Sequence, residues 1–185
     1  MGTYAKESEK RQLRLYAFEC GMIETGPLLA LLSNNFHDLF PKKNPKKIPT
    51  TCFYIQHPKG SLLWGTGLND SYIKIEGGRS FYGGLSRHIV KKTLQKKLKD
   101  IGVSLPSITY VSVSHLHPDH TGNLHLFKKS KILLQKEEVD AGFGPFPFFY
   151  FFEFEHYKSI KDQIQVLNGD YDLFGDGTVT IIKAP

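Results

Sequence analysis

Cysteine is scarce in this sequence. Cys20 and Cys52 are the two cysteines among 185 residues. Two are too few for a disulfide framework, and their spacing is not that of a structural metal site. We expect each to be a small buried side chain. A single disulfide between them is the alternative if the protein is exported.

Long hydrophobic runs are also missing. No segment offers the uninterrupted run of about 20 apolar residues that a membrane-spanning helix needs, and residues 1–16 lack the apolar core of a signal peptide. Repeats are missing too, and the hydrophobic content of 40% is ordinary for a globular domain. The sequence predicts one domain over residues 1–185 without a membrane span, cytoplasmic unless a signal peptide has been removed for a periplasmic or secreted location.

The positive charge is carried mainly by lysines. A net charge of +6 raises the question of a nucleic-acid partner. Two lysine-rich runs, 41–47 and 91–99, contain no arginine among stacking aromatic side chains, which is the pattern of single-strand binders. We interpret the first as an exposed loop and the second as the outer face of a helix, and we expect no nucleic acid as partner.

The order of predicted elements is that of an α/β protein. β-branched and aromatic residues bounded by Gly and Pro predict strands at 13–24 and 50–58, with a hairpin into 61–67. Helical spacing predicts a helix over 85–101 that stops at Gly102; its apolar positions are Leu85, Ile89, Leu94, Leu98 and Ile101. Further strands are expected at 108–114, 131–135 and 178–185. Such an order favours a sheet and helices in layers.

Three histidines and an aspartate follow the strand predicted at 108–114: His115, His117, Asp119 and His120. Ligands of α/β sheets bind beyond the carboxyl ends of strands. His115 and His117 lie two apart on an extended segment, so they can face the same side and hold one metal ion. Asp119 and His120 can serve a second ion, and nitrogen and oxygen ligands suit a catalytic metal. A polar loop that happens to be rich in histidine is the alternative.

The segment after these ligands is expected to open a helix. Asp119 or Thr121 would cap its N-terminus.

The stretch SHLHPDHTGN, 114–123, resembles the signature of the metallo-β-lactamase-fold hydrolases. LLWGTGLND, 62–70, and LNGDYDLFGDGTVTIIKAP, 167–185, are similar to the branch that includes the N-acyl-homoserine lactonases. The resemblance implies an αββα sandwich with a centre of two metal ions, usually zinc, although other divalent metals are alternatives. It also implies that a metal-bound hydroxide hydrolyses a small lactone or ester.

The same resemblance implies roles for the motif residues. His115 and His117 correspond to ligands of the first metal, and Asp119 and His120 to ligands of the second. Asp119 would also pass a proton to the leaving alkoxide, as a catalytic residue. The sequence assigns no residue to substrate binding.

Two features depart from the family pattern. The family has three later ligands, a histidine, a bridging aspartate and another histidine, whereas here the last predicted strand is followed by the end of the sequence, and His156 precedes that strand. Gly65 stands where the family commonly has an aspartate that supports the metal ligands. Loss of such a supporting carboxylate typically reduces metal affinity or activity by roughly 10–100-fold. The alternative to an active hydrolase is therefore a truncated, catalytically impaired relative or a non-catalytic binding fragment.

A phenylalanine-rich segment, 142–156, is punctuated by Gly and Pro and predicts a loop or broken helix. It would form a hydrophobic lid or acyl-chain wall, or else a homodimer contact or a covered surface.

Other polar residues are expected to have structural roles: core or surface for His37, His57, His88 and His125, and turn chemistry for Tyr171, Asp172 and Asp176.

Overall fold

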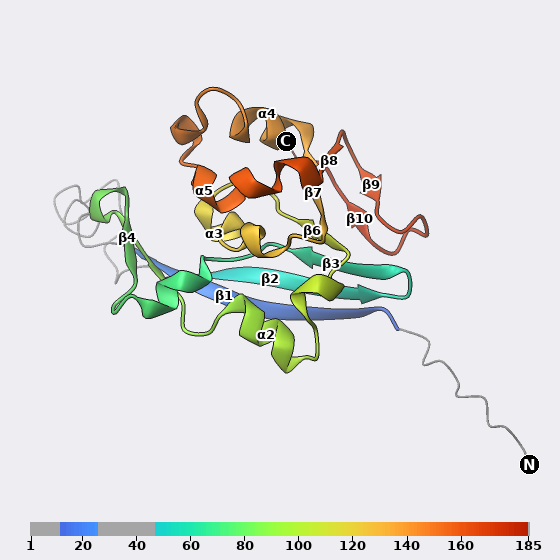
Figure 1. Cartoon of the computed structure of the whole chain (residues 1–185), viewed down its shortest axis with the longest axis horizontal. Coiled ribbons are helices and arrows are strands. Elements are labelled where there is room, and N and C mark those ends of the chain that lie inside the picture. The colour runs from blue at the N-terminus through green and yellow to red at the C-terminus, as the bar shows by residue number, and fades with distance from the viewer. Residues whose placement is uncertain (1–11, 26–46, 185) are drawn as a thin grey trace, which may run out of the picture.

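The computed structural model describes residues 12–25 and 47–184. They form a mixed α/β fold around an eight-stranded sheet (Figure 1). Its strands are β1 (Arg14–Thr25), β2 (Lys47–His57), β3 (Gly60–Trp64), β4 (Arg79–Phe81), β5 (Ser86–Ile89), β6 (Tyr110–Ser112), β7 (Lys131–Gln135) and β8 (Ile164–Leu167). They lie in the order β4-β5-β1-β2-β3-β6-β7-β8. A second, two-stranded sheet pairs β9 (Tyr171–Asp172) with β10 (Thr180–Ile181).

The helices are short. The α-helices are α2 (Leu94–Asp100), α3 (Pro118–Thr121), α4 (Lys136–Gly142) and α5 (Phe154–Tyr157). The 3₁₀ helices are η1 (Asp70–Lys74), η2 (Tyr82–Gly84), η3 (Leu105–Ser107), η4 (Leu124–Leu126), η5 (Pro147–Tyr150) and η6 (Lys158–Gln163). None of the helices in the described ranges is long and apolar enough to cross a membrane.

Strand direction determines which loops meet. β1 and β2 pair antiparallel, and β2 turns into β3 through a tight hairpin, as predicted. β3, β6, β7 and β8 run parallel to one another. Parallel strands have their carboxyl ends at one edge of a sheet. The loops after β3 and β6 therefore lie side by side at that edge.

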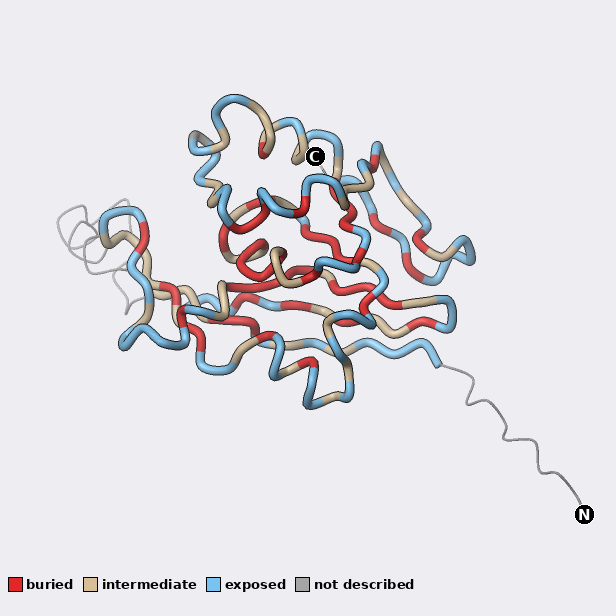
Figure 2. Tube along the Cα trace, in the orientation of Figure 1, coloured by how far each residue is buried: buried red, intermediate tan, exposed pale blue. Residues whose placement is uncertain are grey.

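The two faces of the sheet have different covers. Alternate residues along a strand point to opposite faces. Leu63, Val111 and Ile132 pack with buried residues of α2, η4, α5 and η6, whereas Leu62 and Leu133 pack with residues of β9 and β10. Figure 2 shows the buried residues running through the middle of the molecule, between the helices and the sheet. The main core therefore lies between the sheet and the helices, and the β9–β10 hairpin covers part of the other face of the sheet.

The helix predicted over 85–101 is wrong in its first half. Residues Ser86–Ile89 form β5, which pairs with β1 and β4, and only Leu94–Asp100 are helical. Leu85 and Ile89 are four positions apart, a spacing that fits one face of a strand as well as one face of a helix. Thr93 starts the helix because its side chain accepts a hydrogen bond from the Lys96 N–H at 3.2 Å. Gly102, with φ +78°, follows its end as expected.

Other predicted strands are shorter than expected. Within 108–114 only Tyr110–Ser112 are a strand, and within 178–185 only Thr180–Ile181 are, whereas the strand predicted at 131–135 is confirmed. The turn roles of Asp172 and Asp176 are confirmed, since both carboxylates accept backbone N–H groups of the loop that joins β9 to β10. Tyr171 lies in β9 rather than in that turn.

The two cysteines and the lysines beside α2 lie as the sequence predicts. Cys20 and Cys52 are buried free thiols, as expected. Lys92 and Lys96 both pair with Asp100 on the exposed side of α2. Most of the run 41–47, and His37, lie outside the described residues.

Candidate metal centre

The histidine-rich loop leads from the end of β6 into α3. His117 is the N-cap residue of α3, and Pro118 takes the first helical position, where its fixed φ suits the helix and its missing N–H costs nothing. The prediction that Asp119 or Thr121 caps this helix is therefore wrong. Both lie inside the first turn, and the Thr121 hydroxyl donates back to the His117 carbonyl at 3.0 Å. This single turn determines where the neighbouring ligands point.

His115 and His117 face one another. Nε2 of His115 lies 2.9 Å from Nδ1 of His117, and the ring planes are nearly perpendicular, at 82°. Both side chains are half-buried. Two imidazole nitrogens so close to one another can be directed at one shared ion.

His115 also lies next to Asp119 and His120. One ligand atom from each of these three residues lies within 4.8 Å of the ligand atoms of the other two. Nε2 of His120 lies 3.2 Å from Oδ2 of Asp119, and the His115 and His120 ring centroids are 4.1 Å apart. The four motif residues therefore form one continuous cluster in which His115 lies between His117 and the Asp119–His120 pair.

Each histidine of the cluster has its other ring nitrogen in contact with the protein. The Ser114 hydroxyl lies 2.9 Å from Nδ1 of His115 and 3.3 Å from Nδ1 of His120. Nε2 of His117 donates to the Tyr150 carbonyl at 3.0 Å. Metal-binding histidines are commonly oriented by such a partner on the second nitrogen. The donor set and its supports therefore fit a divalent metal.

Burial and neighbouring charges set the protonation of the cluster. Burial, together with His120 and His117, lowers the pKa of His115 to about 4. Burial on its own would raise the pKa of Asp119, but the hydrogen bond and charge of His120 outweigh it, so this pKa is lowered. At neutral pH His115 is uncharged and Asp119 is ionised, which are the forms that bind metal ions.

The loop after β3 holds the backbone of the cluster. Both the N–H and the hydroxyl of Thr66 donate to the His120 carbonyl, each at 2.8 Å. Gly122 N–H donates to the Gly67 carbonyl at 2.9 Å, and a Cβ on Gly122 would come within 2.3 Å of the Asn69 nitrogen. The two loops are so close that only glycine fits at position 122.

Asn123 completes the connection between the two loops. It is fully buried, and its amide group donates to the carbonyls of Thr66 and Leu68, each at 2.8 Å. Its side-chain oxygen accepts the Asp70 N–H at 2.9 Å. Sequence reasoning missed Thr66 and Asn123 as supporting residues; the signal was two polar residues inside otherwise well-marked motifs, WGTG and HTGN.

Gly65 adopts a backbone conformation that favours glycine. Its φ is +77°, its N–H donates to the Ser112 carbonyl at 2.8 Å, and an added Cβ would lie 3.3 Å from the Thr51 carbonyl oxygen. Any other residue here would be strained. Glycine at this position thus has a structural reason in this chain.

The other histidines that the structure describes lie outside the cluster. His156 is buried, with Nδ1 3.4 Å from the Thr121 hydroxyl and Nε2 3.4 Å from the Tyr72 hydroxyl. Burial lowers its pKa to about 4. His57 and His88 are buried, and His125 is half-buried. Their burial agrees with the core or surface roles expected for them.

The phenylalanine-rich segment lies beside the cluster. It is a broken helix, as predicted, made of the end of α4, then η5 and α5. The Tyr150 carbonyl contacts His117, and the Phe152 ring centroid lies 5.6 Å from the His117 ring. Several aromatic side chains on this segment are exposed to solvent: Phe146, Phe148, Tyr150, Phe151 and Phe154.

The fold and the motif define a class of protein. A mixed sheet carries a His-x-His-x-Asp-His cluster at the carboxyl edge of its parallel strands, and the profile of the metallo-beta-lactamase superfamily matches residues 46–185. The chain belongs to that superfamily.

Curated relatives are N-acyl homoserine lactonases. AttM of Azorhizobium caulinodans is 29% identical over 153 residues, and AttM of Agrobacterium fabrum is 30% identical over the same length. Each alignment covers 75% of this chain and 56% of the relative. The chain therefore spans little more than half the length of the relatives it matches.

Solved structures show the same fold. An N-acyl homoserine lactone hydrolase with the product N-hexanoyl-L-homoserine at its catalytic metal centre superposes with a TM-score of 0.67 at 23% identity, covering 90% of this chain and 62% of that one. AidC, a dizinc quorum-quenching lactonase, superposes with a TM-score of 0.57 at 17% identity, covering 89% and 64%.

Proposed function

We propose that the protein is a zinc-dependent hydrolase that opens lactones or esters, with N-acyl-homoserine lactones as its substrate class. The observation that carries this proposal is the convergence of His115, His117, Asp119 and His120 at the sheet edge. The lactonase names of the relatives and the zinc of AidC support the substrate class and the metal.

The motif residues divide the work in this proposal. His115 and His117 would hold one divalent ion, and Asp119 and His120 would hold the second. When bound, such ions polarise a carbonyl group and lower the pKa of water. Asp119, ionised at neutral pH, accepts a proton and returns it to the leaving alkoxide. Ser114 contacts Nδ1 of His115 and of His120, which would leave the Nε2 atoms of both rings for the ions.

The aromatic segment supplies the apolar part of the site. Its exposed rings lie on the element that contacts His117, so they can form a wall for an acyl chain. Tyr82 supports this wall, because its hydroxyl donates to the Phe151 carbonyl at 3.2 Å and the two rings pack edge to face. The same rings are the surface that a homodimer would use, since exposed apolar patches commonly have a partner.

A second candidate is metal binding without turnover. The chain covers 56% of the length of AttM, so the ligand cluster and the activity of the whole relative are separate questions. A test of the proposal therefore measures metal binding and catalysis separately.

Zinc binding is the first measurement. Titration calorimetry on chelator-treated protein should show binding that His117→Ala or Asp119→Ala weakens by at least about tenfold. His125→Ala is the matched control, because His125 is half-buried and lies outside the cluster. Equal zinc affinity in wild type and His117→Ala would refute the assigned ligands.

Lactone opening is the second measurement. Proton release from N-hexanoyl-homoserine lactone is followed with and without zinc. Turnover that needs zinc and is lost in His117→Ala supports the hydrolase, whereas zinc binding without turnover supports the second candidate. Turnover that is unchanged after metal removal contradicts both.

Sedimentation of wild type and Phe148→Ser tests the homodimer, which predicts a shift toward monomer in the variant.

A further inference from the structure

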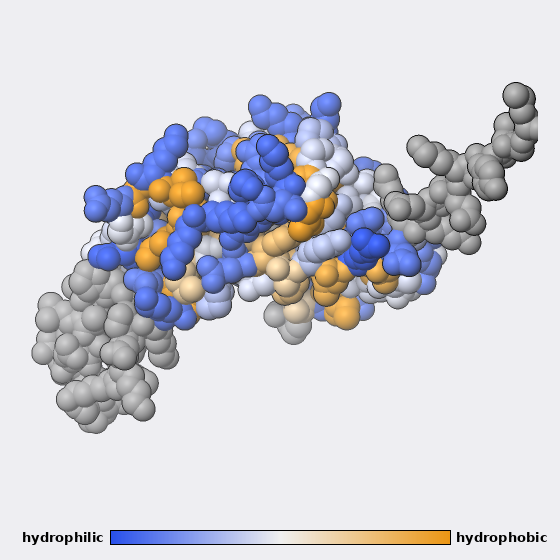
Figure 3. Space-filling view, turned by 90° about the horizontal axis from the view of Figure 1, so that it is seen from below, coloured by the Kyte–Doolittle hydropathy of each residue, from blue (hydrophilic) through white to orange (hydrophobic). Residues whose placement is uncertain are grey.

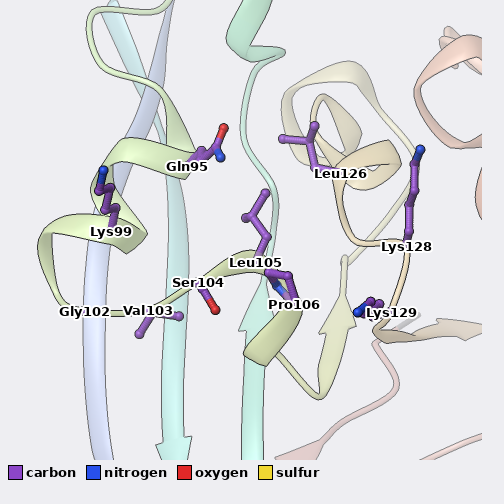
Figure 4. A pocket seen from close by; sticks show the side chains of 10 residues that line it. All are labelled: Gln95, Lys99, Gly102, Val103, Ser104, Leu105, Pro106, Leu126, Lys128 and Lys129. Carbon is purple, nitrogen blue, oxygen red and sulfur yellow. The ribbon is translucent and has the colours of Figure 1, made fainter.

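A hollow of about 620 Å³ lies away from the His115–His120 cluster. Figure 4 shows the side chains that line it. It is formed by α2, by residues 102–106 and by residues 126–129. Residues 102–106 precede β6, and residues 128 and 129 precede β7, whereas the His115–His120 cluster follows β6. The hollow therefore lies at the opposite edge of the parallel strands, and the proposed hydrolase site does not use it.

The floor of the hollow is apolar. Val103, Leu105, Pro106 and Leu126 are the apolar residues of its lining. In Figure 4 the side chains of Leu105 and Leu126 extend toward the space between α2 and η4. Figure 3 shows the underside of Figure 1, where hydrophobic patches lie among hydrophilic side chains. A floor of this kind favours a ligand with a hydrocarbon part.

Lysines form the rim of the hollow. Lys99 lies on one side, on α2, and Lys128 and Lys129 lie on the other (Figure 4). The lining contains no aspartate or glutamate. Neighbouring Lys92 and Lys96 have Asp100 as partner, but among the described residues no carboxylate lies within ion-pair distance of the three rim lysines. All three rim lysines are exposed.

The combination of floor and rim selects the ligand. An inorganic anion would leave the apolar floor exposed, and a neutral hydrocarbon would leave the ammonium groups without a partner. The lining has no aromatic side chain on which nucleic-acid bases could stack. We propose that this hollow binds a small anionic amphiphile, with an unbranched acyl chain over Leu105 and Leu126 and an acidic head group between the rim lysines. A volume of 620 Å³ is in the usual range for such ligands.

Dodecanoate below its micellar concentration is the probe. We expect saturable 1:1 binding by calorimetry to the full chain, with methyl NMR shifts at Leu105 and Leu126. Shortening the chain to decanoate should weaken binding, by up to about fourfold for each buried methylene removed. Dodecyltrimethylammonium, which has the same tail and the opposite charge, should not displace it. Equal binding of the cation, or shifts confined to the aromatic segment 146–154, would overturn the proposal.

Variants test the rim. Lys128→Gln combined with Lys129→Gln should weaken dodecanoate binding by about tenfold. Lys74→Gln combined with Lys91→Gln removes the same charge from exposed positions outside the hollow and should leave binding unchanged. Equal effects of the two double variants would reduce the result to net charge and overturn the site. Hexaglutamate is the peptide control, and a preference for it over dodecanoate at Leu105 and Leu126 would replace the amphiphile with an acidic protein segment.

Discussion

Replacing Asn123 tests whether the contact between the loops after β3 and β6 holds the fold together. Asn123 is fully buried and lies two residues beyond the end of α3. Its side chain makes hydrogen bonds to the backbone of Thr66, Leu68 and Asp70, all between 2.8 and 2.9 Å. Asn123→Ala removes these bonds and leaves two carbonyls and one N–H without their partner.

The expected loss follows from the number of bonds. A net contribution of about 0.5–1.5 kcal/mol for each hydrogen bond gives a decrease in the free energy of unfolding of about 2–4 kcal/mol. Asn123→Asp should be worse, since a carboxylate would replace the amide that donates to the Thr66 and Leu68 carbonyls and would place a charge in a fully buried position.

Urea unfolding followed by circular dichroism measures this loss. Asn168→Ala is the matched control, because Asn168 is exposed, and it should stay within about 0.5 kcal/mol of wild type. A stability of Asn123→Ala equal to that of Asn168→Ala would refute the reasoning. So would an Asn123→Asp variant that is more stable than Asn123→Ala.

Three further predictions concern the same region. Gly122→Ala should lower the free energy of unfolding by about 1–3 kcal/mol in urea titrations, because its Cβ would meet the Asn69 nitrogen, and an unchanged midpoint would contradict this. Ser114→Ala should weaken zinc binding by about 10–100-fold in calorimetry while Ser114→Thr retains it, and equal affinities would exclude a supporting role for the hydroxyl. His156 has a pKa of about 4 in the folded protein and therefore binds fewer protons there than in the unfolded chain. The free energy of unfolding should thus fall by about 3 kcal/mol as the pH is lowered from 6.5 to 4. That part of the pH dependence should vanish in His156→Gln; an identical profile in the variant would contradict the assignment.

Much of the sheet could be predicted because its signals are local. The strands at 13–24, 50–58 and 131–135 carry β-branched and aromatic residues in short runs between turn residues, and the structure confirms them. The helix over 85–101 failed because spacing of four residues does not separate strand from helix. The pairing of β5 with β1, more than 60 positions earlier in the sequence, decides the outcome, and such pairing is not visible locally.

The candidate site was predictable for the same reason. Its four motif residues lie within six positions, so a single strand end and one helical turn bring them together. The supports were not predictable. Thr66 and Asn123 are 57 positions apart, and the Tyr150 carbonyl reaches His117 from 33 positions away. These contacts depend on how loops meet at the sheet edge, for which a pattern in one segment gives no signal.

The elements that carry the His115–His120 cluster are too short to be rigid by themselves. β6 has three residues and α3 has four, and isolated helical turns are unstable in water. The cluster therefore depends on the loop after β3, through the bonds of Thr66 to His120 and of Asn123 to that loop. It follows that stability and zinc affinity should fall together in Asn123→Ala. In Ser114→Ala affinity should fall alone, because among the described residues the Ser114 hydroxyl has the imidazoles of His115 and His120 as its hydrogen-bond partners.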